Sequence, residues 1–208
     1  MIKHCFILFI TITNFSWALT GDEILAKVTA KFKSLESLEA KFEVSLIWQM
    51  TKREEKMEGL YVFKKPGLYS ILMNSQEIWC NGETLWRYSK QNNQILIQDI
   101  LDAGQTFDLG TLLKQSTKNY LIKYIGNTKI NGIECWEVLL DSNSPDQYFS
   151  KLSLWIDPNN EIPKKVVTND LNGNQGTYLF LKIKLNKEIA DEYFDFTPPK
   201  GVETLDMR

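Results

Sequence analysis

The chain has 208 residues and a formal net charge of −2, and 24 % of its residues carry charges of mixed sign. This length can bury a substantial core, and the balanced charge argues against nucleic acid or an anionic membrane surface as a partner. No linker, repeat or low-complexity segment divides the sequence, so we expect one domain after a short leader.

Residues 1–18 have the three parts of a secretory signal peptide. Lys3 gives a positive start, the segment from Cys5 to Phe15 is mostly apolar, and small residues precede a cleavage point after Ala18. The apolar run is too short for a stable bilayer anchor, and the residues before Cys5 do not match a lipoprotein cleavage site. We therefore expect export without a lipid anchor. The alternative is that residues 1–18 form a buried N-terminal strand.

The mature chain, residues 19–208, is predicted to begin with an amphipathic helix. Thr20 and Glu23 have the spacing of a capping box, and apolar residues follow at helical spacing to about Leu35. From Ala40 to Met50 the period changes to two, which predicts a long strand with one apolar face.

The segment from Lys56 to Tyr88 predicts a β-meander with large apolar and aromatic side chains on both faces. Gly59 to Phe63 and Leu68 to Met73 are strand-like, with a turn between them, and Asn81-Gly82 is a strong hairpin signal. Both faces of such a meander need a cover, so the sequence raises the question of what covers the second face.

Residues 99–118 interrupt the β-pattern, because apolar residues there lie among glycines and polar residues. The pattern predicts one or two short helices, apolar on one side, that lie on the open face of the sheet. Strand-like segments resume at Tyr120, and turn signals such as Asn131-Gly132 divide them to the end of the chain. In total the sequence predicts ten to twelve strands.

The mature sequence offers few residues for catalysis. The only histidine, His4, leaves with the leader, which excludes Ser-His-Asp, Cys-His and histidine-zinc sites, and no phosphate-binding P-loop or dinucleotide-binding glycine motif is present. Residues 157–161 match a calcium loop only in part, and a hairpin turn explains them better. We expect no enzyme activity, cofactor or metal. Cys80 and Cys135 could form a disulfide or lie buried as thiols.

The surplus of apolar residues leaves two folds open. A sandwich would cover both faces of the meander, whereas a half-closed barrel with a helical cap would enclose a cavity for an apolar ligand. Composition and periodicity do not decide between the two folds.

Three segments resemble the periplasmic outer-membrane lipoprotein carrier family, LolA. The segment Gly59–Tyr69 is similar to the family's signature of a glycine, a hydrophobic strand, a basic residue, arginine, proline and an aromatic residue. The segment Cys80–Tyr88 is similar to its D-G-x-x-L-W-x-Y hairpin, with Asn81 for the aspartate, and Phe194–Val202 to its F-x-F-x-P-P-x-G-V ending. The resemblance covers nearly the whole mature chain.

The resemblance implies a mainly β fold with some α structure: an incomplete, strongly curved antiparallel β-barrel capped by helices. It also implies a periplasmic, monomeric chaperone that is not an enzyme and binds the acyl chains of lipoproteins in a hydrophobic cavity. Such a carrier accepts lipoproteins from an inner-membrane ATP-binding-cassette exporter (LolCDE). It delivers them to an outer-membrane receptor (LolB).

The resemblance further implies roles for individual residues. The mid-chain insert would form a lid over the cavity, and Lys65 stands where the family has an arginine that latches this lid. Lysine lacks the planar five-donor fork of arginine, so Lys65 is either a weaker latch or an ordinary surface residue. The expected cavity residues are Phe42, Val44, Leu46, Trp48, Tyr61, Phe63, Tyr69 and Ile71, and the expected lid residues are Leu101, Phe107, Leu109, Leu112 and Leu113.

Two other functions fit the same half-barrel. One is a periplasmic carrier of lipids or glycolipids. The other is a regulatory module that senses lipoproteins and binds a signalling partner.

Overall fold

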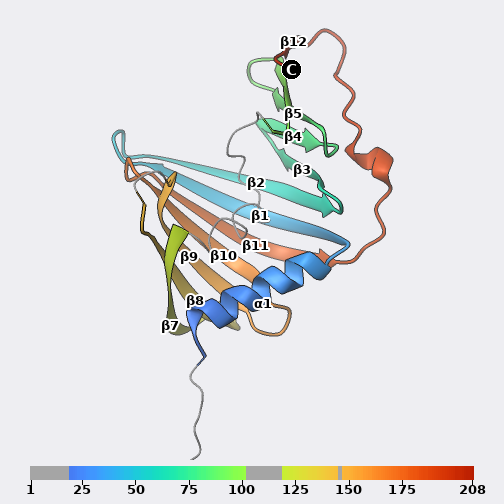
Figure 1. Cartoon of the computed structure of the whole chain (residues 1–208). Coiled ribbons are helices and arrows are strands. Elements are labelled where there is room, and N and C mark those ends of the chain that lie inside the picture. Colours follow the sequence, from blue (N-terminus) through green and yellow to red (C-terminus); the bar gives the residue numbers. More distant parts are fainter. Residues whose placement is uncertain (1–18, 102–118, 145–146) are drawn as a thin grey trace, which may run out of the picture.

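The structure, a computed structural model, describes residues 19–101, 119–144 and 147–208. Twelve strands in these residues form a single sheet in the order β12-β6-β5-β4-β3-β2-β1-β11-β10-β9-β8-β7. Figure 1 shows that this sheet is curved and remains open, with β7 and β12 at its two edges. The fold is therefore mainly β, as the sequence predicts.

Most neighbouring strands are consecutive in the chain and antiparallel. Two pairings are not local: β1 pairs with β11 at the centre of the sheet, and β12 pairs in parallel with β6 at one edge. The strands are β1 (Ser37–Trp48), β2 (Arg53–Lys64), β3 (Leu68–Met73), β4 (Gln76–Cys80), β5 (Thr84–Ser89), β6 (Gln94–Asp99), β7 (Tyr120–Ile130), β8 (Ile133–Ser142), β9 (Phe149–Asp157), β10 (Ile162–Asp170), β11 (Gln175–Leu185) and β12 (Glu203–Asp206).

Helix α1 (Gly21–Ser34) begins with the predicted capping box. The Glu23 amide donates to Thr20 Oγ1 at 3.2 Å, and the Thr20 amide donates to Glu23 Oε2 at 2.9 Å. The apolar stripe of the helix, with Ile24, Leu25 and Val28, is fully buried against β7, β8 and β10. The helix therefore covers one part of the sheet and leaves β2–β6 uncovered on that side (Figure 1).

The side of the sheet that faces α1, called here the inner face, follows from the strand register. On β1, Leu38, Ala40, Phe42 and Val44 point to this face and are buried. Across the neighbouring strands, the inner face continues as rows of directly paired residues. One such row runs through Ala40, Tyr61, Ile71, Ile78, Arg87 and Leu96, from β1 to β6.

The outer face of β4 and β5 is covered by the C-terminal segment that follows β11. Phe196 stacks on Trp79 with ring centroids 5.9 Å apart and also lies 6.3 Å from Trp86. Tyr193, in the short 3-10 helix η1 (Asp191–Phe194), lies 5.5 Å from Trp79. The C-terminal segment therefore covers the second face of the predicted meander at β4 and β5.

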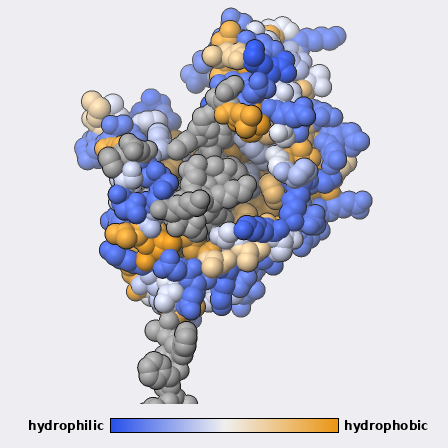
Figure 2. Space-filling view, in the orientation of Figure 1, coloured by the Kyte–Doolittle hydropathy of each residue, from blue (hydrophilic) through white to orange (hydrophobic). Residues whose placement is uncertain are grey.

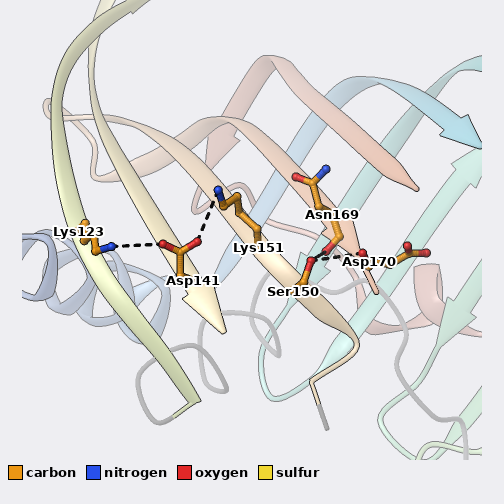
Figure 3. A network of polar contacts seen from close by, with 6 residues as sticks. All are labelled: Lys123, Asp141, Ser150, Lys151, Asn169 and Asp170. Atoms are coloured by element: carbon orange, nitrogen blue, oxygen red, sulfur yellow. Dashed lines mark hydrogen bonds and ion pairs between the residues drawn. The ribbon is translucent and has the colours of Figure 1, made fainter. Parts of the chain in front are cut away.

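Polar pairs link other strands on the outer face. Asp141 on β8 lies between Lys123 Nζ of β7 at 3.5 Å and Lys151 Nζ of β9 at 3.6 Å (Figure 3). In the same view, Ser150 donates to the carbonyl oxygens of Asn169 and Asp170, which ties the start of β9 to the end of β10. These ion pairs and hydrogen bonds link neighbouring strands on the outer face.

The turns agree with the sequence in kind and differ in detail. Asn131 and Gly132 form the expected two-residue hairpin with positive φ angles of 48° and 81°. At Asn81-Gly82 the connection has a third residue, and the Asn81 side chain accepts hydrogen bonds from the amides of Glu83 and Thr84. Strand β2 begins at Arg53, several residues before the predicted strand. Its first half is rich in charged residues with exposed or half-buried side chains, so the sequence there lacks the apolar pattern of a strand.

Both cysteines of the described residues are fully buried thiols that form no disulfide. Cys80 lies on β4 and Cys135 on β8, far apart in the strand order. Of the two possibilities that the sequence leaves open, the structure has buried thiols. Burial raises the pKa of the Cys135 thiol, which suits an unreactive core position.

Candidate functional site

A cavity of about 450 Å³ lies on the inner face, beside the part of the sheet that α1 covers. Its volume falls within the range of ~300–1,000 Å³ that is usual for small-ligand sites. On the face drawn in Figure 2, apolar residues form patches toward the middle, and hydrophilic residues dominate the outline. The lining residues are Phe42, Val44, Leu46, Met57, Tyr61, Ile71, Met73, Gln76, Ile78, Arg87, Tyr88, Ser89, Gln94, Leu96, Tyr178 and Phe180.

One position in the cavity wall depends on a glycine. Gly59 on β2 pairs with Phe42 on β1, and the Phe42 ring lies directly over it. A Cβ at Gly59 would lie 2.4 Å from Phe42 Cζ and 2.8 Å from the carbonyl oxygen of Leu72. The glycine of the sequence signature therefore leaves room for the Phe42 ring in the cavity wall.

Most of the wall is apolar, but the β4–β6 side carries polar side chains beside Ile78 and Leu96. Gln76, Ser89 and Gln94 lie opposite one another on these three strands, and Arg87 lies in the next row. None of the described lining residues carries a carboxylate. The cavity can thus hold a long apolar group, with hydrogen-bond donors at one side.

Tyr178 on β11 supplies a phenol to the opposite wall. Burial, with a smaller contribution from the neighbouring Tyr148, raises the pKa of Tyr178 to about 12. The hydroxyl therefore stays protonated at physiological pH.

The structure brings five of the eight predicted cavity residues together. Phe42, Val44, Leu46, Tyr61 and Ile71 all line the cavity. Phe63 and Tyr69 pair across β2 and β3 and pack in the core outside the lining set, and Trp48, at the end of β1, is 42 % exposed.

The predicted lid falls almost entirely outside the described residues. Phe107, Leu109, Leu112 and Leu113 lie within residues 102–118, of which nothing is described, and Leu101, the last residue before them, is 93 % exposed. The proposed latch, Lys65, directs its Nζ to Glu36 Oε1 at 3.2 Å, while its amide donates to the Glu36 carbonyl.

Sequence reasoning missed all of the lining contributed by β4–β6 and β11. Tyr178 and Phe180 alternate with Leu179 and Leu181, so periodicity gave no preference for either face. Arg87 gave no signal either, because it stands within an aromatic hairpin motif where a charged residue suggests solvent.

Within the described ranges, no group of three histidine, cysteine or acidic side chains is arranged to hold a metal ion. None of the helices in these ranges is long and apolar enough to cross a membrane.

An open, curved sheet with an apolar cavity on its inner face defines the class of this protein, and the comparisons place it in a family. The sequence model of the family described as "Outer membrane lipoprotein carrier protein LolA" matches residues 33–197. The chain belongs to this LolA family.

The relatives differ in length. The outer-membrane lipoprotein carrier protein of Francisella tularensis subsp. novicida is 27 % identical over 206 residues, covering 97 % of this chain and 95 % of its own. An uncharacterized protein of Methanocaldococcus jannaschii is 25 % identical over 191 residues, covering 90 % of this chain. The chain spans about half, 54 %, of that archaeal relative.

Among solved structures, an uncharacterized conserved protein from Thermus thermophilus has a TM-score of 0.61. The match covers 89 % of this chain and 98 % of that one, at 13 % sequence identity. At this identity the likeness supports the fold alone.

Proposed function

We propose that the protein is a carrier that binds the acyl chains of lipoproteins in the cavity of the inner face. The observation that carries this proposal is the set of apolar side chains from β1, β2, β3 and β11 that line one continuous cavity. Membership of the LolA family, and the similarity to the lipoprotein carriers of Francisella, support the same function.

The energetics favour such cargo. Each CH₂ group moved from water into an apolar site contributes about 0.8 kcal/mol, so an acyl chain needs a shield to cross an aqueous space. Contacts that are mainly apolar hold a chain without strict demands on its shape, which suits a ligand that must be handed on. The flexible side chains of Met57 and Met73 in the wall can adapt to such a ligand.

We further propose that the carrier works in the periplasm between two membrane partners. It would accept lipoproteins from an inner-membrane exporter of the LolCDE type and deliver them to an outer-membrane receptor of the LolB type. The signal-like residues 1–18 support this location.

The test is to purify the chain from the periplasm of its own host and to examine it by native mass spectrometry. We expect a triacylated protein bound at a one-to-one ratio. The variant Leu46→Trp places a bulky ring at a partly exposed lining position and should reduce the bound fraction at least about tenfold, since the ring competes for the same volume.

The matched control is Leu181→Trp, at an exposed position of β11 outside the lining set. It should retain the cargo, and circular dichroism should show that both variants fold. Recovery of the wild-type protein without acylated cargo, or equal loss in both variants, would refute the proposal. A small lipid in place of a lipoprotein would favour a lipid carrier.

A further inference from the structure

The two walls of the cavity differ in chemistry. The wall made by β1 and β11 presents Phe42, Val44, Leu46 and Phe180, together with the protonated phenol of Tyr178. The wall made by β4, β5 and β6 presents a patch of hydrogen-bonding groups, which we call the polar wall. It consists of Gln76, Arg87, Ser89 and Gln94.

The polar wall is fixed by the strand register. Gln76 pairs with Ser89, and Ser89 pairs with Gln94, so these three residues stand side by side on adjacent strands. Arg87 is in the neighbouring row, between Ile78 and Leu96. The four residues therefore form one patch on the regular part of the sheet.

Arg87 cannot turn to the outer face without breaking the alternation of β5. Its neighbour Trp86 occupies the outer face, where it packs 6.3 Å from Phe196, and Leu85 is fully buried on the inner side. Among the lining residues that the structure describes, Arg87 is the one with a charged side chain. The strand thus holds a guanidinium group against an apolar cavity.

A purely hydrocarbon ligand would fit this wall poorly. It would cover the two amides and the hydroxyl of Gln76, Gln94 and Ser89 and would offer no acceptor in return. Leaving such a group without its hydrogen bonds costs about 1–3 kcal/mol. A ligand with oxygen acceptors at this wall avoids that cost.

We propose that the polar wall is a head-group site for an amphiphile. The acyl chain lies against β1 and β11, and ester or phosphate oxygens at its head accept hydrogen bonds from Arg87, Gln76, Gln94 and Ser89. The inference rests on the proposed function, because it assumes that the cavity holds an acyl chain. The glyceryl esters of an acylated protein and the phosphate of a phospholipid share this oxygen chemistry.

The test compares ligands with the same chain and different heads. Tetradecane has no oxygen, monomyristin has an ester and hydroxyl groups, and myristoyl lysophosphatidylglycerol adds a phosphate. The affinity of each is measured by displacement of an apolar fluorescent dye from the purified chain. Arg87→Leu should weaken both oxygen-bearing ligands by about tenfold or more and leave tetradecane unchanged or slightly tighter.

Further variants separate the head-group role from a structural one. Arg87→Lys keeps the charge and should retain most of the binding of the phosphate ligand. Gln76→Leu changes an exposed lining residue and should weaken the oxygen-bearing ligands selectively, even if Arg87→Leu fails to fold. The matched control is Arg53→Leu, which removes an exposed arginine paired with Glu55 outside the cavity and should change nothing.

The outcomes distinguish this inference from the proposed function. Failure of all three ligands to displace the dye would contradict acyl binding itself. Displacement by all three with no selective effect of Arg87→Leu and Gln76→Leu would leave acyl binding in place and overturn the head-group site. A loss confined to lysophosphatidylglycerol identifies the phosphate as the preferred group, and an equal loss for monomyristin identifies the ester.

Discussion

Gly59 is the position where the cavity wall depends on the absence of a side chain. Because an added Cβ would meet the Phe42 ring at 2.4 Å and the Leu72 carbonyl oxygen at 2.8 Å, the ring or the strand must move. We expect Gly59→Ala to lower the free energy of unfolding by about 1–3 kcal/mol and to weaken dye binding in the cavity. Urea denaturation and dye titration measure the two effects.

A double-mutant cycle checks the cause of this loss. In a Phe42→Leu background the ring contact is absent, so Gly59→Ala should cost less, although the contact with the Leu72 carbonyl remains. Equal costs in both backgrounds would show that the ring is not the reason for the glycine.

Tyr178 links the cavity to stability at high pH. Its pKa of about 12 in the folded protein lies above the ordinary value of about 10 in the unfolded chain. Between these values the unfolded chain loses the proton and the folded protein keeps it, so stability falls as the pH rises, by about 2–3 kcal/mol in total.

The variant Tyr178→Phe removes this titration. Urea denaturation at about pH 8 and about pH 11.5 should show a smaller loss of stability for the variant than for the wild type. Some loss should remain, because burial also raises the pKa of Tyr120 and of Cys135. Identical losses in the two proteins would mean that Tyr178 ionises as freely in the fold as in the unfolded chain.

Lys65 is the residue whose role the family resemblance leaves most open. Its ion pair with Glu36 is exposed, and such pairs contribute only about 0–1 kcal/mol to stability. We expect Lys65→Leu to change stability within that range and to alter the rate of cargo release only modestly. A large accumulation of undischarged lipoprotein in this variant would instead show that Lys65 latches a lid.

At the scale of elements, the segment from η1 to Phe196 acts as a cover for the outer face of β4 and β5. Its aromatic side chains pack on Trp79 of β4 and Trp86 of β5. The inner side of these two strands carries Gln76, Arg87 and Ser89 of the cavity lining. Lys64 on β2 donates to the Ile189 carbonyl at 2.6 Å and pairs with Asp191, which fixes the start of the segment. The inner wall therefore depends on packing behind it.

We expect Phe196→Ala to destabilise the protein by about 1–3 kcal/mol, because the contacts with both tryptophans disappear. Hydrogen exchange should speed up selectively in β4 and β5. Met207→Ala, at a position that is 59 % exposed, serves as the control and should have little effect. Faster exchange spread evenly over the sheet would contradict a local supporting role.

The elements that could be predicted are those with a local cause. The capping box of α1, the alternation of β1 and the Asn131-Gly132 turn each follow from residues close in the chain, and all three are present. The parallel pairing of β12 with β6 could not be predicted, because it joins residues far apart and leaves no periodic trace. The polar wall was hidden for a similar reason, since it arises only when three strands align.

For the whole molecule, we propose that the described residues, with one sheet and one main core, make one folding unit. The main cluster of buried side chains extends from Ile24 of α1 through β1 to Phe180 of β11 and also includes residues of β3, β4 and β8. We expect a single unfolding transition in urea, with far-ultraviolet circular dichroism and tryptophan fluorescence coinciding. Separate transitions would show that β3–β6 with β12 unfolds independently of the strands around α1.

The central pairing of β1 with β11 has a consequence for the order of folding. Ser37 at the start of β1 donates to the Lys187 carbonyl, across 150 residues of chain. The middle of the sheet therefore cannot close until almost the entire polypeptide is available, and contacts of such long range slow folding. A chain emerging slowly from a ribosome or a translocation pore would stay without its core for most of that time. The delay keeps the chain unfolded, so that it can pass through the pore. It also leaves the exposed strands accessible to chaperones until the last segments arrive.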